Sequence, residues 1–231
     1  EPGRYLCCGQ GVDGIMEEVD YIFFVDFDGT IATVDVCEKM VAAFAGDGWQ
    51  EINEMWERKE LSTLECARQT LKLFRTNDPA DFFSLLNNVT IDPGFPLFLT
   101  YCRERNFPVV ILSDGYSFYI EHLLRREGIE LPYYANTMVF RPELDIEAPY
   151  ISERCDLCGV CKLELMQKLA PAAEKTVYVG DGYSDFCPAQ SADVVFGKAR
   201  LYEHCLREGK TVFHFTDFAD IVQQLRIMNK E

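Results

Sequence analysis

Short, mostly apolar runs bounded by polar residues are the clearest pattern in the chain. Continuous apolar runs, as opposed to alternating ones, are typical of strands that a parallel sheet buries on both faces. The runs are only four to six residues long, which fits strands better than helices. We therefore predict strands of a parallel sheet at residues 21–25, 107–112, 176–179, 193–196 and 211–214.

Helical patterns alternate with these runs along much of the chain. Alternation of strands and helices predicts an α/β fold, here a Rossmann-like, doubly wound parallel sheet. Ligands bind such sheets outside the carboxyl ends of the strands, so polar residues that follow different strands should converge. The predicted helices occupy residues 114–127, 162–169, 184–190, 199–208 and 218–228.

Residues 35–90 have a different texture, with helical periodicity and little sign of strands. Ser62 and Glu65 have the spacing of a capping box, which marks the first turn of a helix. Asp78 followed by Pro79 marks a further helix start. We interpret this segment as a helical cap domain inserted after the first strand.

These patterns define the predicted domain organisation. Residues 20–34 and 91–231 form the Rossmann-like catalytic core, and residues 35–90 form the helical cap. A smaller insertion, rich in proline and tyrosine, is expected at about residues 130–158, as an irregular lobe or a small hairpin.

Charge narrows the possible partners. The 231 residues include 38 acidic and 22 basic ones, a formal net charge of -16, which repels nucleic acid and anionic membranes. No apolar run approaches the length of a membrane span, and residues 1–20 lack the apolar stretch of a secretory signal. We expect a cytoplasmic protein with no nucleic-acid or membrane partner. The oligomeric state cannot be predicted from these features.

Ten cysteines are present, and most are scattered in ordinary segments, as reduced thiols of a cytosolic protein would be. Cys155, Cys158 and Cys161 instead form a C-x2-C-x2-C cluster. Three thiols at this spacing suit a structural zinc site, with Cys187 or another residue as the fourth ligand. Reduced thiols packing a tight loop, or a disulfide, are the alternatives.

The candidate chemistry begins directly after the first strand, at Asp26-Phe-Asp-Gly-Thr30. Asp26 can attack phosphorus as a carboxylate nucleophile, and Asp28 can protonate the leaving alkoxide and later deprotonate water. Gly29 permits a tight turn, and we predict that the Thr30 hydroxyl is one of the phosphate-binding groups. An acidic turn that caps a helix would share the same residue types.

Ser113, Asp114 and Gly115 follow the second strand, where a hydroxyl and backbone amides at a helix start suit phosphate oxygens. A simple serine N-cap is the alternative. Because a nucleophilic carboxylate and a phosphoryl group repel each other, a cation is needed nearby. Lys162 is the candidate, although most lysines are solvated surface residues.

Asp181 and Asp185 follow the third strand, four residues apart. Hard oxygen ligands, in a chain with only three histidines, favour Mg²⁺ over zinc at this place. The sequence therefore predicts a magnesium cofactor and a small phosphorylated metabolite as the substrate.

Taken in chain order, these motifs resemble the four-motif signature of haloacid dehalogenase-type phosphatases, over roughly residues 21–196. The resemblance implies a Rossmann-like core with a helical cap, and an aspartyl-phosphate intermediate. It implies Asp26 as the nucleophile, Asp28 as the acid and base, Ser113 and Lys162 as phosphate ligands, and Asp26, Asp181, Asp185 and the backbone carbonyl of Asp28 around Mg²⁺.

Residues 112–118 and 178–188, with the cysteine cluster that runs into Lys162, are similar to one subgroup of that family. It contains phosphoethanolamine/phosphocholine phosphatase and 2-hydroxy-3-keto-5-methylthiopentenyl-1-phosphate phosphatase. Hydrolysis of a small phosphomonoester is the leading functional hypothesis. A phosphotransferase using the same residues, and a non-catalytic metal-binding or redox-sensing protein, are the alternatives.

The cap and the serine motif supply the candidates for substrate selection. An acidic and aromatic pocket would suit an amine or a quaternary ammonium group. Packing in the core or on a helix surface is the competing role for each residue. The candidates are Asp35, Glu38, Trp49, Tyr116 and Phe118.

Overall fold

A computed structural model describes residues 19–155, 157–170 and 173–230 of the chain. The expectation about a secretory signal rested on residues 1–20, and nearly all of these lie outside the described ranges. Cys7 and Cys8 also lie outside them. None of the described helices is both long enough and apolar enough to cross a membrane.

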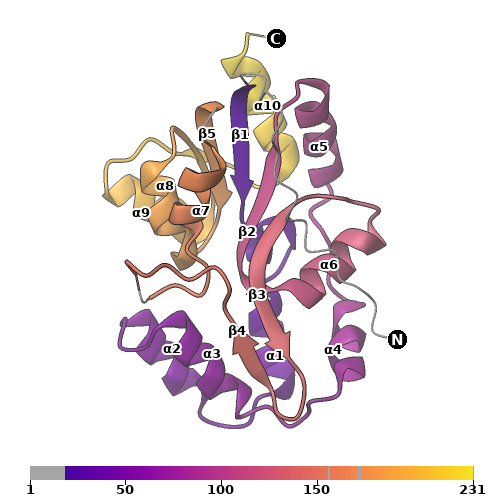
Figure 1. The fold of residues 1–231 in the computed structure, drawn as a ribbon. Coiled ribbons are helices and arrows are strands. Elements are labelled where there is room, and N and C mark those ends of the chain that lie inside the picture. The colour runs from indigo at the N-terminus through magenta and orange to yellow at the C-terminus, as the bar shows by residue number, and fades with distance from the viewer. Residues whose placement is uncertain (1–18, 156, 171–172, 231) are drawn as a thin grey trace.

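A seven-stranded sheet forms the centre of the molecule (Figure 1). Every neighbouring pair in it is parallel except β3 and β4. The order is β4-β3-β2-β1-β5-β6-β7, so the direction of winding reverses at β1 and β5, the two strands at which ligands are expected. This confirms the predicted doubly wound α/β fold. The strands are β1 (Val19–Val25), β2 (Val109–Tyr116), β3 (Tyr133–Val139), β4 (Asp145–Glu147), β5 (Ala173–Gly180), β6 (Val194–Gly197) and β7 (Phe213–His214).

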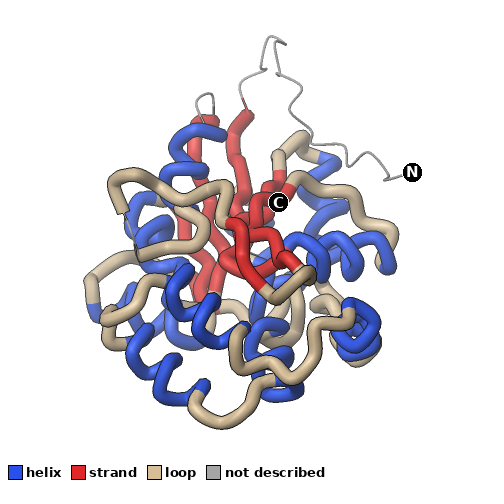
Figure 2. The backbone as a smooth tube through the Cα atoms, turned by 60° about the horizontal axis from the view of Figure 1, so that its bottom comes forward, coloured by secondary structure: helices blue, strands red, loops and turns tan. Residues whose placement is uncertain are grey.

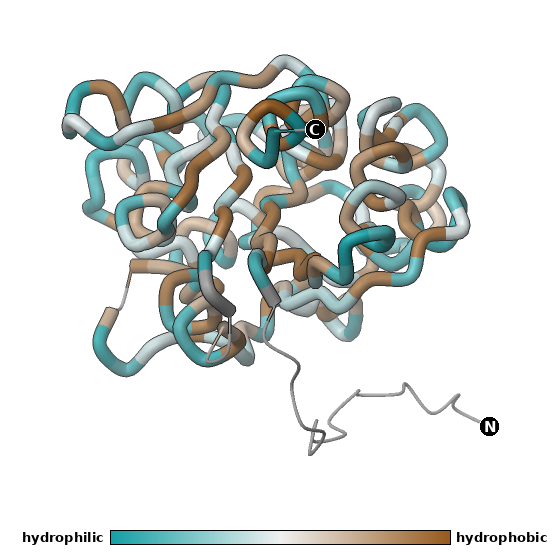
Figure 3. Tube along the Cα trace, turned by 90° about the horizontal axis from the view of Figure 1, so that it is seen from above, coloured by the Kyte–Doolittle hydropathy of each residue, from teal (hydrophilic) through white to brown (hydrophobic). Residues whose placement is uncertain are grey.

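Helices cover both faces of the sheet, as Figure 2 shows. Side chains of β1 alternate between these faces, because successive residues of a strand point in opposite directions. Phe23 packs edge-on against Phe98 of α5 (Phe95–Glu104) in one hydrophobic cluster. Phe24 belongs to the second cluster, with Leu165. Both rings are fully buried, and Figure 3 shows hydrophobic segments in the middle of the molecule and also within the surrounding helices.

The remaining helices of the core follow the same division. Helices α5, α6 and α10 contribute to the cluster around Phe23, whereas α7, α8 and α9 contribute to the cluster around Phe24. The predicted helices at residues 162–169 and 218–228 have the same bounds as α7 and α10 of the structure. Their bounds are α6 (Ser117–Arg126), α7 (Lys162–Leu169), α8 (Phe186–Ser191), α9 (Ala199–Arg207) and α10 (Phe218–Met228).

Four helices lie between β1 and α5, at the lower end of the sheet in Figure 1. Ser62 and Glu65 form the predicted capping box, and Asp78 caps the helix that begins at Pro79. Ala32 pairs with Ile91, so the chain leaves the core and returns to it at adjacent points. These helices share a buried cluster with the core, and their status as a separate cap domain stays a prediction. They are α1 (Val36–Phe44), α2 (Trp49–Glu57), α3 (Thr63–Leu71) and α4 (Pro79–Leu86).

Residues 130–158 differ from the expected insertion. Residues 133–139 form β3, which pairs with β2 in the main sheet, and only β4 adds the expected hairpin. The sequence hides β3 because Asn136 and Thr137 interrupt its apolar run, although Ala135 and Met138 on either side of them are buried.

The second strand is also longer than its apolar run. Residues 113–115 lie within β2, and α6 begins only at Ser117, so the predicted helix start at residue 114 is wrong. The pairing of β2 with β3 shifts register between Leu112 and Tyr116, which is the signature of a bulge. Ser113 is therefore held in an irregular strand end and does not cap a helix.

Candidate active site

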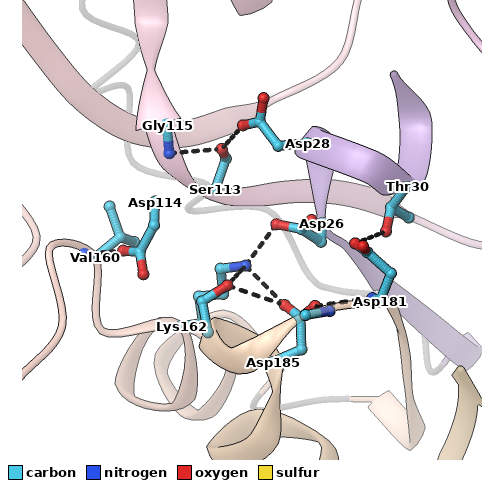
Figure 4. A network of polar contacts seen from close by, with 12 residues as sticks. Asp26, Asp28, Thr30, Ser113, Asp114, Gly115, Val160, Lys162, Asp181 and Asp185 are labelled. Carbon is cyan, nitrogen blue, oxygen red and sulfur yellow. Dashed lines mark hydrogen bonds and ion pairs between the residues drawn. The ribbon is translucent and has the colours of Figure 1, made fainter. Parts of the chain in front are cut away.

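The predicted site residues lie together at the carboxyl ends of β1, β2 and β5 (Figure 4). Asp26 directly follows β1, Ser113 lies near the end of β2, and Asp181 directly follows β5. Lys162 comes from the first turn of α7 and points to the same place. Because these three strands are neighbours in a parallel sheet, their ends share one edge and their polar residues converge.

Lys162 is the central cation of this group. Its Nζ atom lies 2.5 Å from Asp26 Oδ1, 2.7 Å from Asp185 Oδ1 and 2.9 Å from Ser184 Oγ. The residue is only 2% exposed. Burial disfavours its charge, but the two carboxylates outweigh burial and hold the pKa of Lys162 well above its ordinary value. The lysine is thus a fixed positive charge, and not the solvated surface residue that its type usually is.

Asp26 is buried beside this lysine, with 5% of its surface exposed. Burial raises the pKa of its carboxyl well above the usual value, and repulsion by Asp185 adds to the effect, while Lys162 opposes it. One lysine therefore does not balance the carboxylates around it. A further cation would be stabilised strongly at this position.

Asp181 faces Asp26 from the end of β5. Thr30 Oγ1 donates a hydrogen bond of 2.8 Å to Asp181 Oδ1, so this hydroxyl orients an acidic group in the structure. Gly29 has φ +70, and a Cβ there would stand 2.6 Å from Asp181 Oδ2. Burial, followed by repulsion from Asp185, raises the pKa of Asp181 to about 6. The turn after β1 is thus built to admit the Asp181 carboxylate.

Asp185 is fully buried and anchors the loop after β5. Its Oδ2 accepts hydrogen bonds from the backbone amides of Asp181 and Gly182, at 2.9 and 3.0 Å. Its Oδ1 accepts one from the Tyr178 hydroxyl at 2.6 Å, in addition to Lys162. Such saturation fixes the carboxylate in place before any ligand arrives.

Three of the carboxylates meet the geometric requirement of a metal site. Oxygen atoms of Asp26, Asp181 and Asp185 all lie within 4.8 Å of one another. Carboxylate oxygens are the ligands that Mg²⁺ prefers, and the crowding of buried acids is relieved by a divalent cation. The donor set therefore fits Mg²⁺.

Asp28 occupies a different environment from Asp26, although they are two residues apart. Its Oδ1 accepts a hydrogen bond from the Val36 amide at 3.0 Å. Its Oδ2 accepts hydrogen bonds from the hydroxyls of Tyr119 and Ser113, at 2.6 and 3.2 Å. Burial, and then repulsion by Asp35, raises the pKa of Asp28 to about 7. A carboxyl with this pKa can exchange a proton near neutral pH, as an acid and base must.

The second predicted phosphate-binding segment, residues 113–115, is tightly tied to its surroundings. The Gly115 amide donates to Ser113 Oγ at 2.9 Å. The Asp114 carboxylate accepts the Val160 amide at 2.6 Å, and the Asn136 side chain donates to the Asp114 carbonyl. Asp114 therefore braces the loop that leads to Lys162, and its carboxylate is already occupied there.

A pocket of about 470 Å³ opens over Asp26 and Asp28. Its opposite wall comes mainly from the helices at residues 36–71, and the substrate-selecting residues were predicted on the cap and on the serine motif. Phe118 does not line it and packs instead against Phe82 and Phe140. The predicted residues that do line it are Asp35, Glu38, Trp49 and Tyr116.

Two tyrosines contribute hydroxyls that the sequence analysis missed. The Tyr119 hydroxyl donates a hydrogen bond to Asp28, and the Tyr178 hydroxyl donates one to Asp185. Both side chains are fully buried. In the sequence they read as ordinary core positions of a helix and a strand. A polar atom on a buried aromatic residue must find a partner, and this was the one available signal.

The cysteine cluster does not form a three-ligand site in the described part of the chain. Cys155 Sγ and Cys158 Sγ are 4.0 Å apart, and the cysteines among the described residues are free thiols. The described groups with three or more candidate ligands within 4.8 Å are two: Asp26, Asp181 and Asp185; and Asp28, Asp35 and Cys37. The arrangement of the thiols favours the reduced-loop interpretation.

Comparison with known proteins gives a consistent set of relatives. Residues 21–207 match a family described as Putative Phosphatase. Curated relatives named 2-hydroxy-3-keto-5-methylthiopentenyl-1-phosphate phosphatase occur in Brevibacillus brevis and in Microcystis aeruginosa. The first is 29% identical over 217 residues, covering 91% of this chain and 97% of the relative. The second is 29% identical over 208 residues, covering 88% and 97%.

Solved structures with the same fold include phosphoserine phosphatases. One is a phospho-aspartyl intermediate analogue, with a TM-score of 0.69 and 17% identity, covering 90% of this chain and 99% of that one. A substrate-bound phosphoserine phosphatase complex gives the same TM-score, identity and coverage. At this level of identity, the likeness shows the shared fold.

Proposed function

The chain belongs to the putative phosphatase family and is a phosphatase of the haloacid dehalogenase superfamily, and from this we propose that it hydrolyses a small phosphomonoester through an aspartyl-phosphate on Asp26. The observation that carries the proposal is the contact between a buried carboxylate and a buried lysine: Asp26 Oδ1 lies 2.5 Å from Lys162 Nζ, beneath the pocket.

In the first step, Asp26 attacks phosphorus, and the bond between phosphorus and the ester oxygen breaks. Lys162 offsets the charge that nucleophile and phosphoryl group bring together. Asp28, at the pocket side of the same turn, transfers its proton to the departing alkoxide. Ser113 lies next to Asp28, and its hydroxyl, which donates to Asp28 Oδ2 in the structure, turns to the phosphoryl oxygens when substrate binds.

In the second step, water hydrolyses the acyl phosphate. Asp28 has lost its proton to the leaving group and now accepts one from the water molecule that attacks phosphorus. Release of phosphate restores the Asp26 carboxylate and its contact with Lys162. The pKa of about 7 suits Asp28 to both roles, because neither protonation state is strongly disfavoured near neutral pH.

Mg²⁺ is the proposed cofactor. Asp26, Asp181, Asp185 and the backbone carbonyl of Asp28 would hold it, and Thr30 and Gly29 shape the place of Asp181. When bound, the ion neutralises the carboxylates and polarises the phosphoryl group.

For the substrate, we propose the phosphomonoester that the curated relatives are named for, 2-hydroxy-3-keto-5-methylthiopentenyl 1-phosphate. The pocket supports a neutral leaving group with an apolar end, because Met40, Leu71 and Phe74 line it. Its lining arginine, Arg200, is paired with Glu57 and lies over the Tyr183 ring.

A second candidate is a phosphomonoester of an amino alcohol, such as phosphoethanolamine or phosphocholine. Asp35, Glu38 and Trp49 favour it, since carboxylates and an aromatic face attract a cationic group.

We also place the protein in the cytoplasm, in keeping with the free thiols of the described cysteines.

The mechanism is tested by the Asp26→Asn variant, assayed with para-nitrophenyl phosphate and Mg²⁺. The amide cannot act as the nucleophile, so we expect kcat to fall by roughly 10⁴-fold or more. Asp20→Asn is the matched control, because this exposed residue lies at the other end of β1. Activity retained in Asp26→Asn would end the proposal.

The substrate is tested by a panel that contains the methylthiopentenyl ester, phosphocholine, phosphoethanolamine and phosphoserine. We expect the highest kcat/KM for the first. A higher value for the amino alcohol esters would favour the second candidate. Transfer of phosphate to an added alcohol, in place of release into water, would identify a phosphotransferase.

A further inference from the structure

The hydrogen bond between Tyr119 and Asp28 is the least expected contact in the site. Tyr119 comes from α6, 91 residues after Asp28 in the chain, and its hydroxyl lies 2.6 Å from Asp28 Oδ2. This is shorter than the contacts that Asp28 makes with Ser113 at 3.2 Å and with the Val36 amide at 3.0 Å. A short bond to a carboxylate is the strong kind of hydrogen bond in proteins.

The tyrosine ring is held rigidly. Tyr119 is fully buried, and its ring packs against Phe27 and edge-on against Tyr116 and Phe118, with centroids 5.4 to 6.2 Å apart. A rigid ring fixes the position of its hydroxyl, because only the hydrogen can still rotate. Tyr119 therefore offers Asp28 a donor at a defined point in space.

Gly115 leaves room for this contact. A Cβ at this position would stand 1.6 Å from the Tyr119 hydroxyl oxygen and 2.4 Å from Asp28 Oδ2. Any side chain here would thus displace the tyrosine hydroxyl or the carboxylate. The glycine that was predicted to bind phosphate is required first of all for the approach of Tyr119 to Asp28.

The hydroxyl remains a donor under all ordinary conditions. Burial, and then the nearby Asp28, raise the pKa of Tyr119 well above its usual value, so the phenol keeps its proton. Cys37 Sγ lies 3.3 Å from the same oxygen. With Cys37 as donor to the phenol oxygen, the phenol hydrogen is free to point at Asp28.

We propose that Tyr119 is a positioning residue that orients the Asp28 carboxyl for proton transfer to the leaving group; this rests on the proposed function of Asp28. Asp28 stands on a turn, with non-helical backbone angles, and borders the pocket. Its side chain would otherwise rotate about its own bonds. The Tyr119 hydroxyl on Oδ2 and the Val36 amide on Oδ1 hold the plane of the carboxyl even when Ser113 turns to the substrate, which leaves the pocket as the open side of Asp28.

The consequence depends on the leaving group. An alkoxide is a poor leaving group and needs a proton from a correctly aligned acid, whereas para-nitrophenolate leaves without one. Misalignment of Asp28 should therefore lower kcat/KM, which reports departure of the leaving group, only for the first kind of ester, whereas hydrolysis of the acyl phosphate is common to both. A general loss of folding or of phosphate binding would slow both kinds.

The experiment compares Tyr119→Phe with the unchanged protein on β-glycerol phosphate and on para-nitrophenyl phosphate, both with Mg²⁺. The substitution keeps the ring and removes one hydroxyl. We expect kcat/KM on the alkyl ester to fall by about 10-fold, because a misplaced proton donor costs this much. On the aryl ester we expect a change of less than about 3-fold.

Two reference variants separate the possible failures. Tyr21→Phe removes a tyrosine hydroxyl from the core at the far end of β1 and should change neither rate. Asp28→Asn should show the same selectivity for the alkyl ester, with a larger loss.

Suppose that Asp28→Asn shows selectivity for the alkyl ester. The role of Tyr119 is then overturned if Tyr119→Phe changes the rates on both esters equally, or changes neither. If Asp28→Asn shows no selectivity, the acid role of Asp28 fails, and the role of Tyr119 fails with it.

Discussion

The two walls of the pocket are built in different ways. The wall at the sheet edge includes Asp26, whose carboxylate contacts Lys162, and Lys162 in turn contacts Asp185. All three residues are buried, and the contacts are 2.5 and 2.7 Å long. The wall formed by the helices at residues 36–71 is mixed: its apolar residues Met40 and Leu71 are buried, whereas Glu38 is exposed. Trp49 of that wall is half-buried.

This contrast separates two tasks. Groups that act on the phosphoryl group are fixed by strand ends and by buried hydrogen bonds, which a rigid sheet supplies. Groups that meet the leaving group stand on surface helices, where a substitution disturbs little else. We infer that the reaction and the choice of substrate can be changed independently, and each prediction below tests one wall.

The largest effect is expected from Lys162→Met, at the sheet edge. It leaves Asp26 and Asp185 without their cation, in a buried place, and should destabilise the fold by about 3 kcal/mol. Activity should fall by about 10³-fold, because the charge that offsets the phosphoryl group is gone. Urea unfolding and steady-state rates measure the two losses.

Lys168→Met is the matched control, since Lys168 lies on the same helix and forms only an exposed pair with Glu164. Equal effects in the two variants would contradict the special position of Lys162.

A smaller effect is expected from pH on the stability of the metal-free protein. The pKa values of Asp28 and Asp181 are raised to about 7 and about 6, so the folded state binds more protons than the unfolded state between pH 4 and 7. Stability must then fall as pH rises through this range. Thermal unfolding at pH 5 and pH 8 measures it.

Mg²⁺ should reduce this loss, because it binds the ionised carboxylates of the folded state. A metal-free protein more stable at pH 8 than at pH 5 would show that these acids do not dominate its pH dependence.

The rate should also depend on pH, through the acid role of Asp28. With its pKa at about 7, the protonated form is lost as pH rises above 7. We expect kcat/KM for alkyl esters to fall by up to about tenfold per pH unit on the alkaline side. An alkyl ester rate that stays flat from pH 6 to 9 would argue against Asp28 as the acid.

On the helical wall, Trp49→Ala should affect binding more than chemistry. Loss of a half-buried aromatic contact is expected to raise KM for the preferred substrate by about 10-fold. The value of kcat with para-nitrophenyl phosphate should stay nearly constant, because Trp49 belongs to the helical wall and the reacting groups belong to the sheet edge. A drop in both would mean that the two walls are coupled.

The smallest effect is expected where the two walls meet. Arg200 of α9 pairs with Glu57 of α2 at 3.2 Å, and both side chains are partly exposed. Solvent screening makes such pairs weak, so Arg200→Ala should cost less than about 1 kcal/mol. A loss well above this in urea unfolding would reveal a stronger link between the helices and the core.

Much of the fold could be predicted because its strands are continuous apolar runs. The carboxyl ends of parallel strands share one edge. The polar residues that follow the predicted strands ending at residues 25, 112 and 179 could therefore be expected to converge. The strand at residues 133–139 could not be predicted, since Asn136 and Thr137 break its pattern. Its place in the sheet depends on pairing with β2, which no local pattern encodes.

By itself, the sequence determined the doubly wound sheet and the set of acidic and basic groups at its edge, because the spacing of apolar and polar residues is a local property. Only the tertiary structure decided their partners. Tyr119 meets Asp28 across 91 residues, Thr30 meets Asp181 across 151, and Gly115 makes room for the first contact. Such contacts arise from the packing of helices against strands, and packing fixes distances between residues far apart in the chain.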